Sequence, residues 1–238
     1  RGVADIVLLN DSFGALPAAF KEGQRILNGM EDLIRLFLTR AFYAALIILG
    51  AAVVVEAQLF PFIPKHASLI TLVTVGFPTF FIVAWARAGV PTHNLSRTLI
   101  HFVIPASLTF ALAALAVYTF YLVIYLVDLP ETATMAQELE AVAIARTALT
   151  NVIVLMGLLL IPFVEPPTRF WAGGDAYSGD KRPAYLALAM LGVYVLIHLI
   201  PGMRTFFELE VLAWSDYLFI ATVALVWIEN GRIEEALG

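Results

Sequence analysis

The sequence predicts an all-α membrane protein, built as a bundle of six transmembrane helices, and three observations support this prediction. Of the 238 residues, 61% are hydrophobic and only 14% are charged, which leaves too few polar side chains to cover the surface of a soluble domain. The mean hydropathy is +0.88. The apolar residues form long continuous runs and do not alternate with polar ones, a pattern that favours helices and excludes the strands of a membrane β-barrel.

Six segments are apolar over about 20 residues, the length that an α-helix needs to cross the hydrocarbon core of a bilayer. The links between these segments carry Pro, Gly and charged residues, as turns outside the hydrocarbon would. The links are short except at 128–146, so we expect neighbouring helices to be antiparallel, with residues 136–145 extending the fourth helix. The expected spans cover about residues 34–57, 67–86, 102–127, 147–164, 184–201 and 211–228.

The distribution of Lys and Arg gives the expected orientation, because cytoplasmic loops carry an excess of these residues. If the chain enters the first span from the cytoplasm, only Lys65, Arg146 and Arg204 fall on the outer side of the membrane. We therefore expect a multi-pass protein of the plasma membrane with both termini in the cytoplasm.

Residues 1–33 form a different kind of sequence from the rest of the chain. The run 3–9 is β-branched and apolar, which is typical of a buried parallel strand. A turn and helix cap follow at 10–12, and an amphipathic segment leads from Leu16 without interruption into the first span. One strand and one helix do not fold alone. We therefore expect residues 1–33 to be the remnant of an α/β cytoplasmic domain with its stalk, and residues 34–238 to be the transmembrane domain.

A longer pattern begins with the run Ala4-Asp5-Ile6-Val7-Leu8-Leu9-Asn10-Asp11-Ser12-Phe13 and continues along the helix that follows. Its further members are Leu16, Ala19, Glu22, Gly23, Arg25 and Ile26. This pattern resembles P-type ATPases, although Gln24 and Gly29 replace the Arg and Asn that are usual there. The resemblance implies that the stretch is the end of a HAD-like phosphorylation domain and the stalk into the fifth membrane helix of a cation pump.

The resemblance also implies a function. The chain would be the membrane half of an ATP-driven P-type cation pump, containing part of the cation path and the stalk that couples it to phosphorylation. The cofactors of the whole pump would be Mg²⁺ and ATP. Its partners would be the lipid bilayer, the missing N-terminal half of the pump and a transported cation, Ca²⁺ or another.

Two motifs of the family are absent from this sequence, namely the phosphorylated Asp-Lys-Thr-Gly-Thr and the Mg-binding Gly-Asp-Gly-x-Asn-Asp. Phosphoryl transfer needs both the acceptor and the metal clamp in place. We therefore expect this chain to be a fragment that is inactive alone and binds neither cofactor. Two other hypotheses stay open, a six-helix secondary transporter or channel without ATPase activity and a membrane scaffold that transports nothing.

The second span holds the clearest candidate for a cation path. Thr71, Thr74, Gly76 and Pro78 lie within the run Thr-Leu-Val-Thr-Val-Gly-Phe-Pro. Pro78 has no N–H, which frees the carbonyl of Thr74 from its helical donor, and cations in a bilayer require oxygen ligands. A simple proline kink between packed helices is the alternative. The run resembles the sixth membrane helix of calcium pumps, but Thr71 and Val75 replace the Asn and Asp that bind calcium there. It is more similar to a bacterial subgroup of P-type calcium or cation pumps, and the metal stays unassigned.

Polar positions on two other spans complete the candidate set. Thr39 and Tyr43 cluster with Arg40 on one side of the first span, where Arg40 either reaches the phosphates at the membrane edge or serves as an internal counter-charge. Asn151 lies in a polar stripe at the start of the fourth span, a pattern that favours interhelical hydrogen bonding or an amide oxygen in the cation path. We assign no catalytic residue, and the absence of cysteine excludes thiol nucleophiles and thiolate metal sites.

Overall fold

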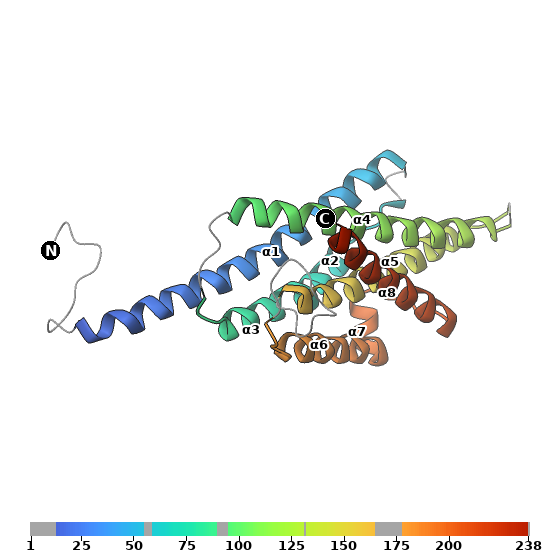
Figure 1. The fold of residues 1–238 in the computed structure, drawn as a ribbon. Helices are drawn as coiled ribbons and strands as arrows, with labels where there is room; N and C mark the ends of the chain where they lie inside the picture. Colours follow the sequence, from blue (N-terminus) through green and yellow to red (C-terminus); the bar gives the residue numbers. More distant parts are fainter. Residues whose placement is uncertain (1–12, 55–58, 90–94, 131, 165–177, 238) are drawn as a thin grey trace, which may run out of the picture.

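The computed structural model describes residues 13–54, 59–89, 95–130, 132–164 and 178–237, and every regular element within these ranges is helical (Figure 1). The strand expected at 3–9 lies outside the described residues. In chain order the elements are the 3₁₀ turn Phe13–Ala15, α1 (Leu16–Val54), α2 (Pro64–Thr71), the π-helical segment η4 (Leu72–Gly76), α3 (Phe77–Trp85), α4 (Leu95–Val127), α5 (Met135–Val164), α6 (Arg182–Leu199), α7 (Pro201–Phe206) and α8 (Trp214–Leu237).

Five helical stretches of the described chain are long and apolar enough to cross a membrane, and they overlap the first five predicted spans, three of which were predicted to end one to four residues later. The predicted extension of the fourth span is confirmed, because α5 already begins at Met135. The sixth predicted span forms helix α8, but α8 is not among the five candidates. Its apolar part is short, since Asp216 lies in its first turn and Glu229 and Asn230 follow Ile228. The prediction of an all-α membrane bundle is therefore confirmed, with five candidate spans among the described residues, and the sixth span stays a prediction.

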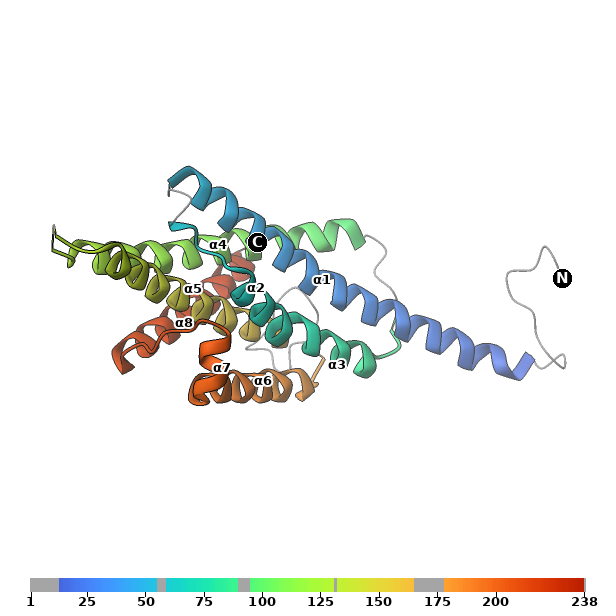
Figure 2. The ribbon, with the colours of Figure 1, turned by 180° about the vertical axis from the view of Figure 1, so that it is seen from behind.

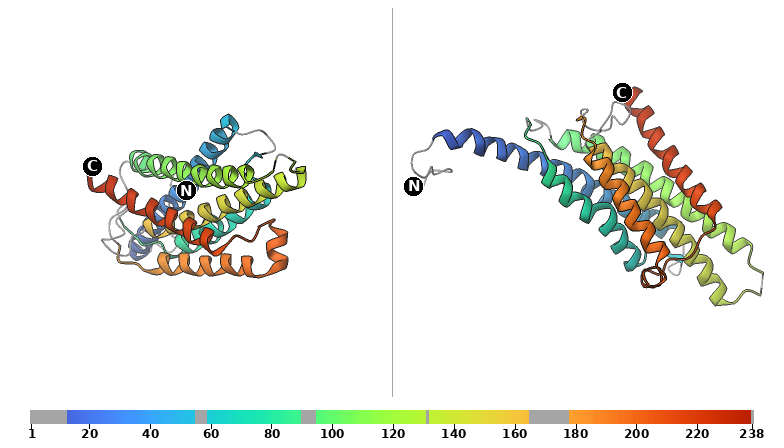
Figure 3. Two further views of the ribbon diagram at one scale, coloured as in Figure 1. Left: turned by 90° about the vertical axis from the view of Figure 1, so that its right-hand side faces the viewer. Right: turned by 90° about the horizontal axis from the view of Figure 1, so that it is seen from below.

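Helix α1 forms both the predicted stalk and the first span. It is one helix of 39 residues, which corresponds to about 60 Å at the usual rise per residue. Its first part projects beyond the bundle, and its second part packs against α4 (Figures 1 and 3). The expected continuity from the amphipathic segment into the first span is confirmed, and the division of the chain at residue 33 stays a prediction.

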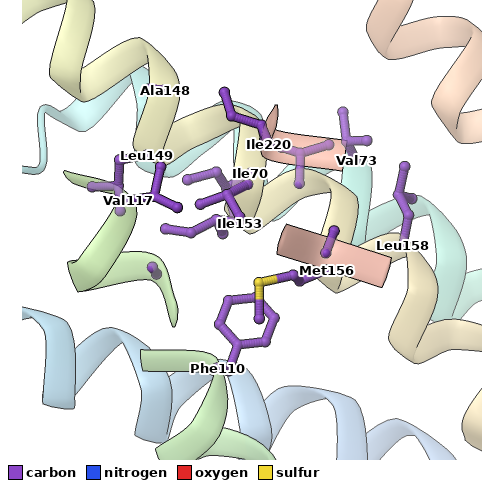
Figure 4. Packing of buried hydrophobic residues seen from close by; sticks show 14 of the residues in the cluster. Ile70, Val73, Phe110, Val117, Ala148, Leu149, Ile153, Met156, Leu158 and Ile220 are labelled. Atoms are coloured by element: carbon purple, nitrogen blue, oxygen red, sulfur yellow. The ribbon is translucent and has the colours of Figure 1, made fainter. Parts of the chain in front are cut away.

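Helix α5 occupies the middle of the bundle. Its apolar window is 89% buried, against 22% to 44% for the other four candidate spans. Leu149, Ile153 and Met156 of α5 lie in one cluster with Phe110 of α4 and Ile220 of α8 (Figure 4). A helix that is apolar around its whole circumference needs this position, so the other helices are arranged around α5.

Candidate cation path

A π-helical segment, Leu72–Gly76, divides the second predicted span into α2 and α3, which together follow α1 along the bundle (Figure 2). The N–H of Phe77 donates to the carbonyl of Leu72, which closes the wider π turn. Pro78 follows in the first turn of α3, where it supplies no N–H. Single π turns within α-helices are frequent at functional sites. The local irregularity expected at Pro78 is therefore present, and it takes the form of a π segment.

Threonine hydroxyls bond backbone carbonyls within this segment and in the turn before it. Thr74 Oγ1 donates to the carbonyl of Ile70 at 2.7 Å, and Thr79 Oγ1 donates to that of Val75, also at 2.7 Å. Thr71 bonds the carbonyl four residues before it in the same way, at 2.5 Å. Each hydroxyl has used its proton, and its lone pairs remain able to accept a hydrogen bond or to contact a cation.

Arg40 of α1 reaches across to α2. Its Nη2 donates to the hydroxyl of Thr71 and, at 3.4 Å, to the carbonyl of Ala67. Both acceptors belong to α2, which precedes the π segment in the chain, and the guanidinium is partly buried between α1 and α2. These contacts favour the internal counter-charge over the alternative in which Arg40 extends to the membrane edge.

Tyr43, one turn further along α1, completes the contact between the two helices. Its side chain is 3% exposed, and its ring stacks on Phe110 of α4 with centroids 4.0 Å apart. Its hydroxyl interacts with the side chains of Thr74 and Arg40. The structure therefore brings three predicted positions together: Thr71 and Tyr43 both contact the guanidinium of Arg40, and Thr74 contacts the hydroxyl of Tyr43.

Two glycines lie at this cluster, and one of them, Gly157, lets another helix approach it closely. A Cβ at Gly157 of α5 would lie 2.9 Å from Cγ2 of Thr74, so α5 can pack against the π segment only because residue 157 has no side chain. A Cβ at Gly76 would lie 3.4 Å from the carbonyl oxygen of Thr71. The close neighbour of Gly76 is thus its own π turn, and the approach of another helix takes place at Gly157.

The other two predicted positions lie apart from this contact network. Thr39 is fully buried, and its hydroxyl has no hydrogen-bond partner within the described part of the chain. Asn151 is 3% exposed, and its Oδ1 accepts a hydrogen bond of 2.8 Å from the hydroxyl of Tyr194 on α6. Asn151 therefore makes the interhelical hydrogen bond that its polar stripe indicated, and a role in the cation path stays a prediction.

The arrangement offers hydroxyl and carbonyl oxygens together with one guanidinium. Among the described residues, no group of three or more His, Cys, Asp or Glu side chains could hold a metal ion. Sequence reasoning missed Gly157 and Tyr194, which position Thr74 and Asn151. A glycine inside an apolar span is a signal that could have drawn attention to Gly157, whereas nothing in the sequence pairs Tyr194 with Asn151.

No family model matches this chain, but several known proteins are similar to it in sequence. The calcium-transporting ATPase CtpE of Mycolicibacterium smegmatis is 29% identical over 98% of this chain, which corresponds to 29% of that protein. CtpE of Mycobacterium tuberculosis is 37% identical over 34% of this chain and 11% of its own length. The probable cation-transporting ATPase exp7 of Streptococcus pneumoniae is 28% identical over half of this chain.

The chain spans less than a third of the length of each of these relatives. The names of these relatives agree with the family that the pattern at the start of the chain indicated. The resemblance to P-type cation-transporting ATPases is therefore confirmed, and this chain is similar in sequence to one part of such pumps.

Proposed function

We propose that this chain is the membrane part of an ATP-driven cation pump, with the cluster of Tyr43, Thr71 and Thr74 as part of the cation path. The observation that supports the proposal most strongly is the position of these hydroxyls, which meet beside α1 at the π segment inside the second candidate span. Similarity to cation-transporting ATPases along nearly the whole chain supports the same function.

Oxygen atoms would guide the cation past the π segment. Thr71 and Thr74 present hydroxyl oxygens, and a π turn leaves some backbone carbonyls without their usual i+4 donor. Arg40 supplies a fixed positive charge beside these oxygens. The transported cation would be Ca²⁺, as the name of CtpE says of that protein, or another ion that oxygen ligands accept.

Coupling to phosphorylation would use the projecting part of α1 as a stalk. Nη2 of Arg25 donates to the carbonyl of Ala84 at 2.7 Å, and Nδ2 of Asn28 donates to that of Arg87 at 2.9 Å. Both acceptors lie at the end of α3, so movement of the stalk would reach the helix that follows the π segment. The motifs that would use Mg²⁺ and ATP are absent from this sequence, and we assign those cofactors to the rest of the pump.

The test is ATP-driven cation uptake by the full-length protein in sealed vesicles, measured for Thr74→Val and for the matched control Thr222→Val. Thr222 is exposed on α8 and makes the same type of bond to a carbonyl four residues earlier. We expect Thr74→Val to weaken the apparent cation affinity and Thr222→Val to leave it unchanged. Equal uptake by both variants would contradict the assignment of the path, and cation flux that follows a gradient without ATP would favour the secondary transporter or channel.

A further inference from the structure

A buried carboxylate joins two helices at the stalk end of the bundle, the end beyond which α1 projects. Asp180 precedes α6, and its side chain is only 4% exposed. Its Oδ2 accepts a hydrogen bond of 3.0 Å from Nη2 of Arg87, which follows α3. Its Oδ1 accepts the backbone N–H of Arg182 at 2.9 Å, and Nε of Arg182 bonds both carboxylate oxygens. One carboxylate thus binds two guanidinium groups and caps the first turn of α6.

Further contacts link this cluster with α3. Nη1 of Arg87 donates to the carbonyl of Ser178 at 3.3 Å. The guanidinium of Arg182 lies over the ring of Trp85, the last residue of α3, at 5.5 Å from the ring centroid. The end of α3 and the start of α6 are therefore connected through hydrogen bonds, ion pairs and a cation–π contact, and each of these contacts involves Asp180, Arg87 or Arg182.

The stalk is attached to the same end of α3. Besides the hydrogen bonds from Arg25 and Asn28, a Cβ at Gly29 would lie 2.9 Å from Cβ of Ala86 and 3.3 Å from Cα of Val83. Backbone-to-backbone packing of this kind allows little sliding. Any tilt of α1 would therefore move the end of α3.

The start of α2, on the other side of the π segment, is held separately. Lys65 Nζ lies 2.7 Å from Oε1 of Glu208 in the link between α7 and α8, and Nε2 of His66 lies 3.2 Å from the carbonyl of Glu208. The two halves of the second span thus have different attachments: α3 is bonded to the stalk part of α1, whereas α2 is bonded to the link between α7 and α8 and, through Arg40, to the part of α1 inside the bundle. Relative movement of these parts would be absorbed at Leu72–Gly76.

We propose that Asp180 is a positioning residue that ties the end of α3 to the start of α6, so that the stalk, α3 and α6 move as one unit relative to α2. This inference rests on the proposed pump function. It assigns to the Asp180 cluster the role of passing stalk movement to two helices together, with the π segment beside Thr74 as the place where the second span bends.

The first test measures coupling in the full-length protein, as cation transported per ATP hydrolysed. We expect Asp180→Asn to retain most ATP hydrolysis and to lower this ratio severalfold, and Asp128→Asn, a carboxyl-to-amide change at an exposed position outside the cluster, to leave it unchanged. Adding Arg87→Gln to Asp180→Asn should lower the ratio little further, because both changes break the same connection. An unchanged ratio in Asp180→Asn would overturn the inference, as would loss of ATP hydrolysis and transport in equal proportion.

The second test does not depend on the stability of an Asp180 variant. The sequence contains no cysteine, so Gly29→Cys with Ala86→Cys can form only one intramolecular disulfide, and the close approach of the two Cβ positions favours it after a small shift. If the stalk and α3 move together, the cross-linked protein should transport as well as the same protein after reduction. Loss of transport on oxidation, with recovery on reduction, would show that the two helices slide past each other and would overturn the inference.

The two tests separate the proposals. If the unmodified full-length protein shows no ATP-driven uptake, the proposed function fails and this inference fails with it. If that protein pumps and Asp180→Asn remains fully coupled, only the role of Asp180 is wrong.

Discussion

Gly157 of α5 faces Thr74 so closely that a Cβ at residue 157 would lie 2.9 Å from Cγ2 and 3.0 Å from Cβ of the threonine. The central helix of the bundle and the π segment are therefore in contact at a predicted position of the cation path. This relationship gives a direct prediction, because any larger side chain at residue 157 must displace Thr74 or α5.

We predict that Gly157→Leu destabilises the protein by about 1–3 kcal/mol, as overpacking of buried contacts does, and that it impairs cation transport more than this loss of stability explains. Gly192→Leu is the control, because nothing lies within 4 Å of a Cβ at that position of α6. Thermal unfolding in detergent and cation uptake in vesicles measure the two effects. Normal transport by Gly157→Leu would mean that the contact with Thr74 has no part in the path.

A second prediction concerns the charge of Arg40. The guanidinium bonds Thr71 beside the proposed path, and a fixed positive charge repels a cation at that position. Arg40→Gln should therefore increase the apparent affinity for the transported cation by about tenfold, which corresponds to ~1.4 kcal/mol. Arg40→Lys, which keeps the charge, serves as the control and should change the affinity much less. Uptake measured as a function of cation concentration gives the apparent affinity. A lower affinity in Arg40→Gln would contradict the proposal that the charge of Arg40 repels the cation.

A third prediction tests the stalk. Ile26 lies on the projecting part of α1 and is 53% exposed, so replacing it removes little packing. Proline at this position removes a helical hydrogen bond and costs ~3 kcal/mol or more of helix stability. We expect Ile26→Pro to abolish transport by the full-length protein while phosphorylation remains largely intact, and Ile26→Ala to be nearly normal. Coupled transport at the normal rate in Ile26→Pro would exclude a coupling role for α1.

A fourth prediction follows from the acidity of Asp180. Hydrogen bonds from Arg182, together with the charges of Arg182 and Arg87, lower the pKa of Asp180 below its usual value, although burial acts in the opposite direction. A carboxyl with a lowered pKa in the folded state stabilises the fold at pH values above its normal pKa, and this stabilisation is lost as the pH falls through the lowered pKa.

The unfolding temperature of the wild-type protein in detergent should therefore fall more steeply below pH 4 than that of Asp180→Asn, which has no carboxylate to protonate. At pH 7 the wild-type protein should be the more stable of the two. Parallel curves for the two proteins across the acid range would show that Asp180 contributes no such stabilisation.

The sequence allowed the main elements and part of the candidate path to be predicted for physical reasons. Apolar runs fix the helices, and the spacing of Thr71, Thr74 and Pro78 places them near one helix face. The lack of an N–H in proline predicts a disturbed backbone near Pro78, but it does not say whether a kink or a π segment results. For α8, hydropathy predicted a span at 211–228, and this stays a prediction, because the polar residues at both ends of the helix keep it outside the five candidate spans.

Contacts between helices could not be predicted in the same way. Whether Arg40 turns toward Thr71 or toward the membrane edge depends on where α2 lies, and the sequence of α1 contains no information on that. The pairing of Asn151 with Tyr194 and that of Arg87 with Asp180 join positions far apart in the chain. One sequence gives residue types and local periodicity, whereas these pairs are determined by how whole helices pack.

The measurement that tests the central claim most directly is ATP-dependent uptake of a labelled cation, with Ca²⁺ as the first choice, by the full-length protein in sealed vesicles. We predict uptake that requires ATP and Mg²⁺, proceeds against the cation gradient and becomes weaker when Thr74 is replaced by valine. Flux that is independent of ATP, follows the gradient and is unaffected by that replacement would contradict both the pump and the proposed path.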